Sequence, residues 1–84
     1  MDNDGMMITN RFFVCIDLLK DTGRMEGGLK EFCDRHQINR SHLSYKRSNV
    51  EHTALKPEVI KWLCEDYDVN INYIMFNKGK ILNK

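Results

Sequence analysis

Apolar residues recur at helical spacing in the first part of the chain and predict a helix over about residues 9–22. Thr9 is expected to cap its start, and Gly23 is expected to end it in the left-handed conformation. Three glycines within residues 23–28 predict a loop, from which Met25 is expected to fill the core. The stripe that should face the core consists of Phe12, Cys15, Ile16 and Leu19.

Two short helices are predicted next. The first runs from Gly28 or Leu29 to His36 and turns apolar side chains inward, and the second runs from Arg40 to about Arg47 behind the N-cap residue Asn39. Leu43 alone is clearly apolar within the second of these helices, so most of that helix must face outward. Two short helices across a tight turn, the second nearly all polar, are what a helix-turn-helix needs.

The rest of the pattern predicts a connection over residues 48–55 and then two more helices. Pro57 suits the first position of a helix that runs to about Tyr67. Asn72 is expected to cap a short helix over residues 73–76, before a turn at Gly79. The core stripe of the longer helix is expected to hold Ile60, Leu63, Cys64 and Tyr67. The prediction is a single all-α domain of five helices over residues 9–84, after a frayed tail over residues 1–8.

Composition indicates a soluble globular protein. The 84 residues are 42% apolar and 30% charged, and no apolar run approaches the roughly 20 residues of a membrane span. The acidic N-terminus does not resemble a signal peptide. Three cysteines without a CxxC pair favour reduced core thiols in a cytoplasmic protein, and they lack the paired short spacings of zinc sites. No metal, cofactor, small-molecule ligand or membrane partner is expected.

The charge distribution is local. The net charge is only +1, but residues 35–47 carry four arginines or lysines and no acid. Such a basic stretch favours contact with nucleic acid, although an ordinary solvated helix face is the simpler alternative. An enzyme is not expected, because no nucleophile has a base at a readable spacing and no glycine-rich loop follows a strand. The three histidines fall at positions expected to be outward or in loops: His36, His42 and His52.

Three segments resemble the Cro and lambda-type phage repressor family of helix-turn-helix proteins. They are LKEFCDRHQINRSHLSYKRS (29–48), PEVIKWLCEDYDV (57–69) and NINYIMFNKGKIL (70–82), and the resemblance covers about residues 10–82. Cys33, Ile38 and Leu43 match the family's small residue at the helix crossing and its two aliphatic anchors. Gln37 stands where the family usually has a glycine with positive φ, so a positive φ is expected there. His36 replaces a usual aliphatic residue, and Lys46 a usual apolar one.

The resemblance implies a small transcriptional regulator, of the prophage or mobile-element repressor type, that binds double-stranded DNA. Its second motif helix would lie in the major groove, and a dimer would span two half-sites. The residues implied at base edges are Arg40, Ser41, Ser44 and Tyr45. Those implied at phosphates are Lys30, Asn39, Lys46 and Arg47.

Surplus apolar residues near the C-terminus suggest a homodimer, since a domain this small cannot bury all of them. The alternative is that the C-terminal segment folds back and covers them. The candidates for the interface are Trp62, Tyr73, Met75, Phe76 and Ile81. A second hypothesis for the function is a protein-interaction or antitoxin-like module that keeps this fold with weak or no DNA binding.

Overall fold

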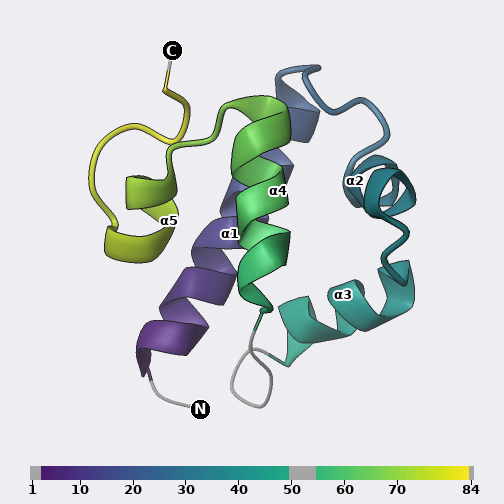
Figure 1. Ribbon diagram of the computed structural model, residues 1–84, viewed down its shortest axis with the longest axis horizontal. Coiled ribbons are helices and arrows are strands. Elements are labelled where there is room, and N and C mark those ends of the chain that lie inside the picture. Colours follow the sequence, from purple (N-terminus) through teal and green to yellow (C-terminus); the bar gives the residue numbers. More distant parts are fainter. Residues whose placement is uncertain (1–2, 50–54, 84) are drawn as a thin grey trace.

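A computed structural model describes residues 3–49 and 55–83 (Figure 1). The described residues form five helices, which confirms the all-α prediction for this part of the chain: α1 (Asn3–Asp21), α2 (Leu29–His36), α3 (Arg40–Ser48), α4 (Pro57–Tyr67) and α5 (Ile71–Phe76). Extended pairing within these ranges is limited to one antiparallel bridge between Val69 and Leu82. Residues 50–54 of the expected connection lie outside the described residues.

The two longest helices form the centre of the molecule. In Figure 1, α4 passes in front of α1, with α2 and α3 on one side and α5 on the other. Helix α1 contacts both α3 and α5, and α4 also contacts α5. The bounds of α2, α3 and α4 agree with the sequence prediction to within a residue, and Pro57 is the first residue of α4 as expected.

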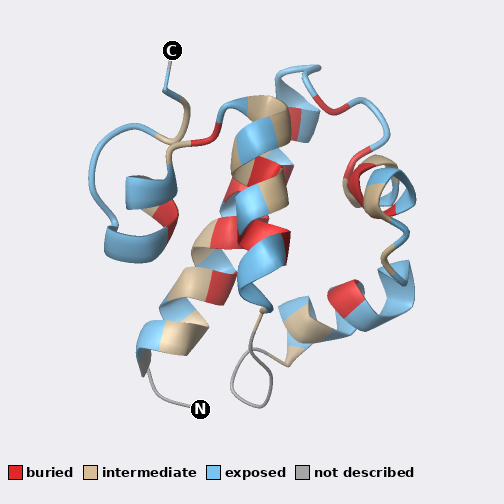
Figure 2. Cartoon of the chain, in the orientation of Figure 1, coloured by how far each residue is buried: buried red, intermediate tan, exposed pale blue. Residues whose placement is uncertain are grey.

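The core lies between the helices, as the buried faces turned inward in Figure 2 show. All four residues of the predicted α1 stripe are buried, and Phe13 joins them. Met25 is buried from the loop before α2, which confirms its predicted role. On α4, Ile60 and Leu63 are buried, whereas Cys64 and Tyr67 are half-buried and pack against the core.

The start of α1 differs from the prediction. The helix begins at Asn3, so residues 3–8 are helical rather than a frayed tail, and Thr9 is not its N-cap. Thr9 is buried within the helix, where its hydroxyl donates to the Gly5 carbonyl at 2.9 Å. Ile8 packs against the core and Asp4 lies in the first turn, where a negative charge complements the helix dipole.

The start of α5 also differs, because the cap is Asn70 rather than Asn72. The Asn70 side-chain oxygen accepts a hydrogen bond from the Asn72 amide at 3.0 Å, so the helix begins at Ile71. The Asn70 side-chain amide also donates to the carbonyls of Lys78 and Lys80, on either side of the turn at Gly79. One asparagine therefore fastens both the start of α5 and the segment that follows it.

The C-terminal segment folds back toward the end of α4. The Asn70 backbone amide donates to the Ile81 carbonyl at 2.7 Å, and the Asn83 backbone amide donates to the Asp68 carbonyl at 3.1 Å. Ile81 and Leu82 are half-buried against the core as a result. The fold-back covers these two residues but leaves the outer side of α5 exposed.

Gln37, directly after α2, has φ 56° and ψ 40°. The positive φ expected at this position is confirmed. A non-glycine residue there costs about 1–2 kcal/mol, while a glycine has more freedom to lose on folding. We therefore expect Gln37→Gly to raise the free energy of unfolding by about 0.5–1 kcal/mol in urea titrations. Gln37→Ala, which keeps the strain, is the control and should give no gain, and equal effects of the two variants would contradict the prediction.

Candidate nucleic-acid interface

The two-helix unit, residues 29–48, consists of α2, a connection of Gln37, Ile38 and Asn39, and α3. The connection is tight because the Ile38 amide donates back to the Cys33 carbonyl at 2.9 Å. Asn39 caps α3 as predicted, with its side-chain oxygen accepting from the His42 amide at 3.1 Å. Cys33 and Leu43 are buried, and Ile38 packs against the core. The three predicted packing residues therefore hold the unit in place.

The outer face of α3 carries the four predicted base-edge residues. Arg40, Ser41, Ser44 and Tyr45 are all exposed, and Tyr45 is 56% exposed despite its aromatic ring. At 3.6 residues per turn, Ser41 and Tyr45 lie opposite the buried Leu43, and Ser44 lies about 100° from Leu43 on the same outer side. The structure therefore presents these three on one outward face, with Arg40 at its N-terminal end.

Arg40 is the most available cation of this face. It begins α3, and within residues 3–49 and 55–83 no acid lies within ion-pair distance of its guanidinium. It lies close enough to Cys33 to oppose the rise in the pKa of that thiol that burial and then Asp34 produce. An exposed arginine at the start of a polar helix is suited to an anionic or carbonyl-rich partner.

The four predicted phosphate residues are placed less uniformly. The Asn39 side chain is used for capping. Lys30 lies 3.2 Å from Asp34, but both side chains are largely exposed, so water competes with this pair. Arg47 pairs with Asp17 of α1 at 2.5 Å and lies over the Phe13 ring at 5.4 Å, so it ties α3 to α1. Lys46 is half-buried.

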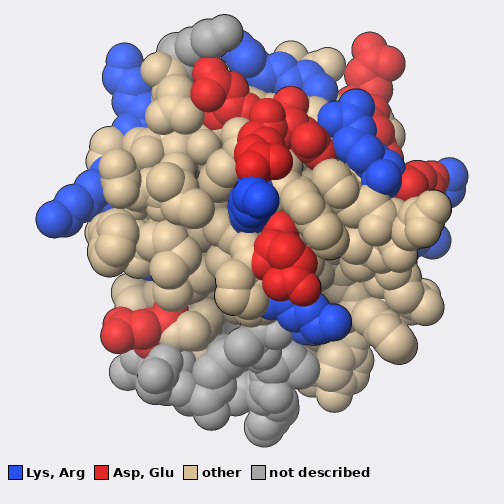
Figure 3. All heavy atoms as spheres, in the orientation of Figure 1, with Lys and Arg blue, Asp and Glu red and all other residues tan. Residues whose placement is uncertain are grey.

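Charge on the side that carries α4 is mixed. Figure 3 shows acidic side chains over its upper and central part, with lysines and arginines beside them. Among the described residues, this face offers no continuous positive surface to a phosphate backbone. Helix α3 itself contains basic residues and no acid, so its exposed face is the better candidate for a nucleic-acid contact.

A cleft of about 350 Å³ lies beside the unit, between the turn, α3 and the first half of α4. Trp62 forms part of its wall and stacks on His36, with ring centroids 4.5 Å apart and planes 3° apart. Lys46 also lines the cleft. Trp62 is half-buried and packs against the core, so it is less available to a partner chain than the surplus of apolar residues suggests.

The other dimer candidates divide into two groups. Tyr73 and Ile81 are half-buried against the core, whereas Met75 and Phe76 are 36% and 64% exposed. Ile71, which the sequence analysis missed, is also exposed on α5. At 3.6 residues per turn Ile71 and Met75 share one side of α5, and Phe76 lies roughly 100° farther round the helix. These three exposed residues together are called the α5 apolar face below. A helix start at Ile71 would have put 71 and 75 on one side, which was the missing signal. A groove of about 320 Å³ with mainly apolar walls adjoins Ile71 and Met75.

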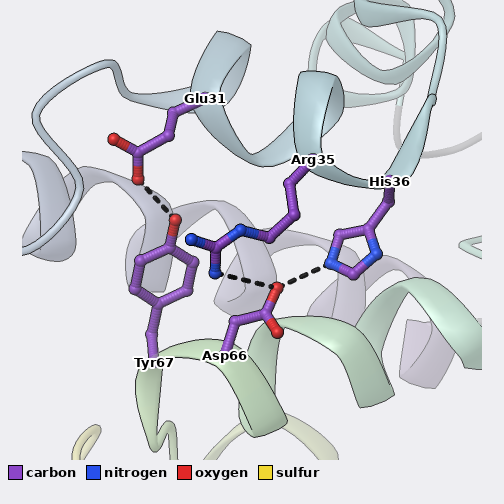
Figure 4. Close-up of polar contacts among 5 residues, drawn as sticks. All are labelled: Glu31, Arg35, His36, Asp66 and Tyr67. Atoms are coloured by element: carbon purple, nitrogen blue, oxygen red, sulfur yellow. Dashed lines mark hydrogen bonds and ion pairs between the residues drawn. The ribbon is translucent and has the colours of Figure 1, made fainter.

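A set of polar contacts between α2 and α4 was not foreseen (Figure 4). Tyr67 donates to Glu31 at 2.5 Å, and Asp66 accepts from His36 at 2.6 Å. Arg35 lies 3.6 Å from the same Asp66 oxygen. The expectation that His36 faces outward is wrong, since it is half-buried; His52 lies outside the described residues. Glu31 and Arg35 are four residues apart and so lie on one side of α2, which was the signal that the sequence offered.

The Tyr67 phenol gives this contact a pH dependence. Burial, and after it the hydrogen bond to Glu31, raises the pKa of Tyr67 from 10.0 to about 12. Between pH 10 and about pH 12 the unfolded chain binds fewer protons than the folded protein. The stability that is present below pH 10 should therefore be lost as the pH rises toward 12. Cys15 adds a similar loss from pH 9, because burial raises its pKa to about 12.

We expect Tyr67→Phe to show a shallower fall in urea midpoint than the parent between about pH 10 and pH 12. Tyr45→Phe, at an exposed tyrosine, is the matched control and should follow the parent. A Tyr67→Phe curve that coincides with the parent curve over this window would contradict the assignment.

Comparisons with known proteins neither support nor contradict the resemblance to a known family. No family model, curated protein or solved structure matches this chain. Within the described residues, no three metal-ligating side chains come together and no helix is long and apolar enough to cross a membrane.

Proposed function

We propose that this protein binds double-stranded DNA sequence-specifically, as a small transcriptional regulator of the repressor type. The two-helix unit would act as a lambda-repressor-like helix-turn-helix, with α3 in the major groove. The observation that carries the proposal is the exposed polar face of α3, with Arg40 at its end and Ser41, Ser44 and Tyr45 along it.

The chemistry of that face suits base edges. Arginine donates two hydrogen bonds to a guanine, and a serine hydroxyl donates or accepts at any base. The Tyr45 ring can contact a thymine methyl group, and its hydroxyl can reach a phosphate. Because Leu43 alone is buried within α3, the helix keeps most of its surface for a partner. Lys30 would exchange its exposed acidic partner for a phosphate at modest cost, whereas Arg47 would also give up its contacts with α1.

Binding of a labelled random duplex at rising salt tests the proposal. The logarithm of the affinity should fall linearly with the logarithm of the salt concentration, with a slope of about −0.9 for each phosphate neutralised. Selection from a random library should then enrich one sequence. No binding above background, or binding without salt dependence, would overturn the proposal.

We propose in addition that two copies associate through the α5 apolar face. One protomer has Cα extents of 31 × 29 × 20 Å, which fits one half-site when half-sites lie about 34–36 Å apart. Large apolar side chains exposed together on one short helix favour an interface. Ile71, Met75 and Phe76 meet this description.

Sedimentation equilibrium should accordingly show a dimer that Phe76→Glu converts to monomers, because a charge buried in the interface would be costly. Val14→Glu places the same charge at another exposed apolar residue, on α1, and is expected to stay dimeric. A monomeric parent protein, or a dimer that survives Phe76→Glu, would contradict this interface.

The second candidate function is the protein-interaction module. The α5 apolar face and the near-neutral charge favour it. It predicts a stoichiometric protein partner whose capture requires Phe76 and ignores Arg40→Ala. The DNA proposal predicts the reverse dependence on these two residues for duplex binding.

A further inference from the structure

Helix α2 is too short to be stable alone, and the backbone on either side does not fix its direction. It has eight residues, and an isolated helix of that length is marginal in water. Gly28 before it and Gln37 after it both have positive φ, so the chain changes direction at each end. Within the helix, Phe32 and Cys33 are the fully buried side chains. Contacts with neighbouring elements must therefore fix its orientation.

Two of the polar contacts between α2 and α4 meet at one carboxylate. The same Asp66 oxygen accepts from the His36 Nε2 atom at 2.6 Å and faces an Arg35 nitrogen at 3.6 Å, as Figure 4 shows. The Asp66 and His36 side chains are 19% and 17% exposed, so water screens this pair less than a surface ion pair. The Arg35 guanidinium also lies over the Tyr67 ring at 5.6 Å.

The His36 ring makes two aromatic contacts in addition to the hydrogen bond at its edge. It stacks on Trp62 of α4, and the Phe32 ring lies 5.2 Å away at a tilt of 58°. His36 is the last residue of α2, and the turn that leads to α3 begins at the next residue. Holding His36 in place therefore also fixes the point from which α3 departs.

We propose that Asp66 is a positioning residue that sets, through His36 and Arg35, the orientation of the two-helix unit relative to α4. Its importance for DNA recognition rests on the proposed function, whereas its effect on helix orientation does not. The competing account is that the buried apolar contacts of Phe32, Cys33 and Leu43 fix the orientation alone and that Asp66 adds only stability.

The consequence for recognition follows from the directionality of hydrogen bonds. Base-edge bonds depend on the aim of α3, whereas phosphate contacts tolerate small rotations. Loss of Asp66 should therefore reduce discrimination between the selected duplex and a random one more than it reduces binding to the random duplex. A purely stabilising residue would leave that ratio unchanged in samples that are fully folded.

Residual dipolar couplings of the backbone amides test the positioning directly, without DNA. In the parent protein, one alignment tensor should fit α1, α2, α3 and α4 together. In Asp66→Ala the couplings of α2 and α3 should depart from the tensor that fits α1 and α4, through rotation or loss of order. Glu65→Ala is the matched control, since Glu65 pairs with Lys61 in an exposed i,i+4 contact on α4. It should retain the single tensor.

Asp66→Asn keeps the size of the side chain and one acceptor oxygen for His36, and it provides a second measurement if the alanine variant does not fold. We expect a smaller departure of α2 and α3 than in Asp66→Ala, but one larger than in Glu65→Ala. A single tensor in every folded Asp66 variant would overturn the proposal. These measurements contain no DNA. If no duplex binds, the proposed function fails, but the role of Asp66 in helix orientation is still tested by the couplings.

Discussion

Arg40→Ala is expected to weaken binding to the selected duplex by about tenfold to a hundredfold, since a bidentate arginine–guanine contact is worth about 1–3 kcal/mol. The fold should not change, because Arg40 is exposed and no acid within the described residues lies within ion-pair distance of it. Fluorescence anisotropy with the selected and a random duplex measures the effect. The loss should be concentrated on the selected sequence.

Arg24→Ala is the matched control for charge. Arg24 is an exposed arginine in the loop before α2, so the variant loses the same charge at a position outside α3. Both variants lose the same net charge, so the difference between them reports the contact that Arg40 makes with the DNA. Equal losses in the two variants would show that Arg40 makes no direct contact with DNA, and equal losses on the selected and random duplexes would show that it does not contact a base.

Phe32→Ala should lower the free energy of unfolding by about 3–5 kcal/mol. Phe32 is fully buried in α2 and packs edge-on against Phe12 of α1, with ring centroids 6.0 Å apart. A chain of this length has a total stability of about 4–13 kcal/mol, so the variant should be close to unfolding. Urea titration followed by the emission of Trp62, the single tryptophan, measures the loss.

Phe76→Ala removes the same side chain at a position that is 64% exposed, and we expect a loss of roughly 0.5 kcal/mol or less in the monomer. The comparison therefore isolates burial from residue type. A Phe32→Ala loss no larger than that of Phe76→Ala would contradict the packing of α2 on α1.

Features encoded by neighbouring residues were predictable from the sequence. Asn39 and Pro57 mark the starts of α3 and α4 because capping and proline geometry act within one turn of helix. The stripe of α1, the buried Leu43 and the positive φ of Gln37 follow from local spacing or from the family resemblance. The exposure of the polar α3 residues follows in turn, because a helix with one clearly apolar residue buries little else. These residues are Arg40, Ser41, Ser44 and Tyr45.

Features that depend on distant residues were not predictable. The segment 3–8 has little apolar periodicity, and its helical conformation goes with packing of Ile8 against the core. The Arg11 side chain donates to the Ile74 carbonyl at the end of α5, 63 positions away. The contact between His36 and Asp66 joins residues 30 positions apart. Periodicity reports which side of a helix is apolar, but it does not report which polar side chains will meet.

The central claim is that the exposed face of α3 contacts DNA, and amide chemical shifts of the labelled protein titrated with the selected duplex test it most directly. The account predicts the largest shifts at Arg40, Ser41, Ser44 and Tyr45, with smaller shifts at Lys30 and Arg47. Shifts confined to the α5 apolar face, or no shifts at low salt, would contradict it.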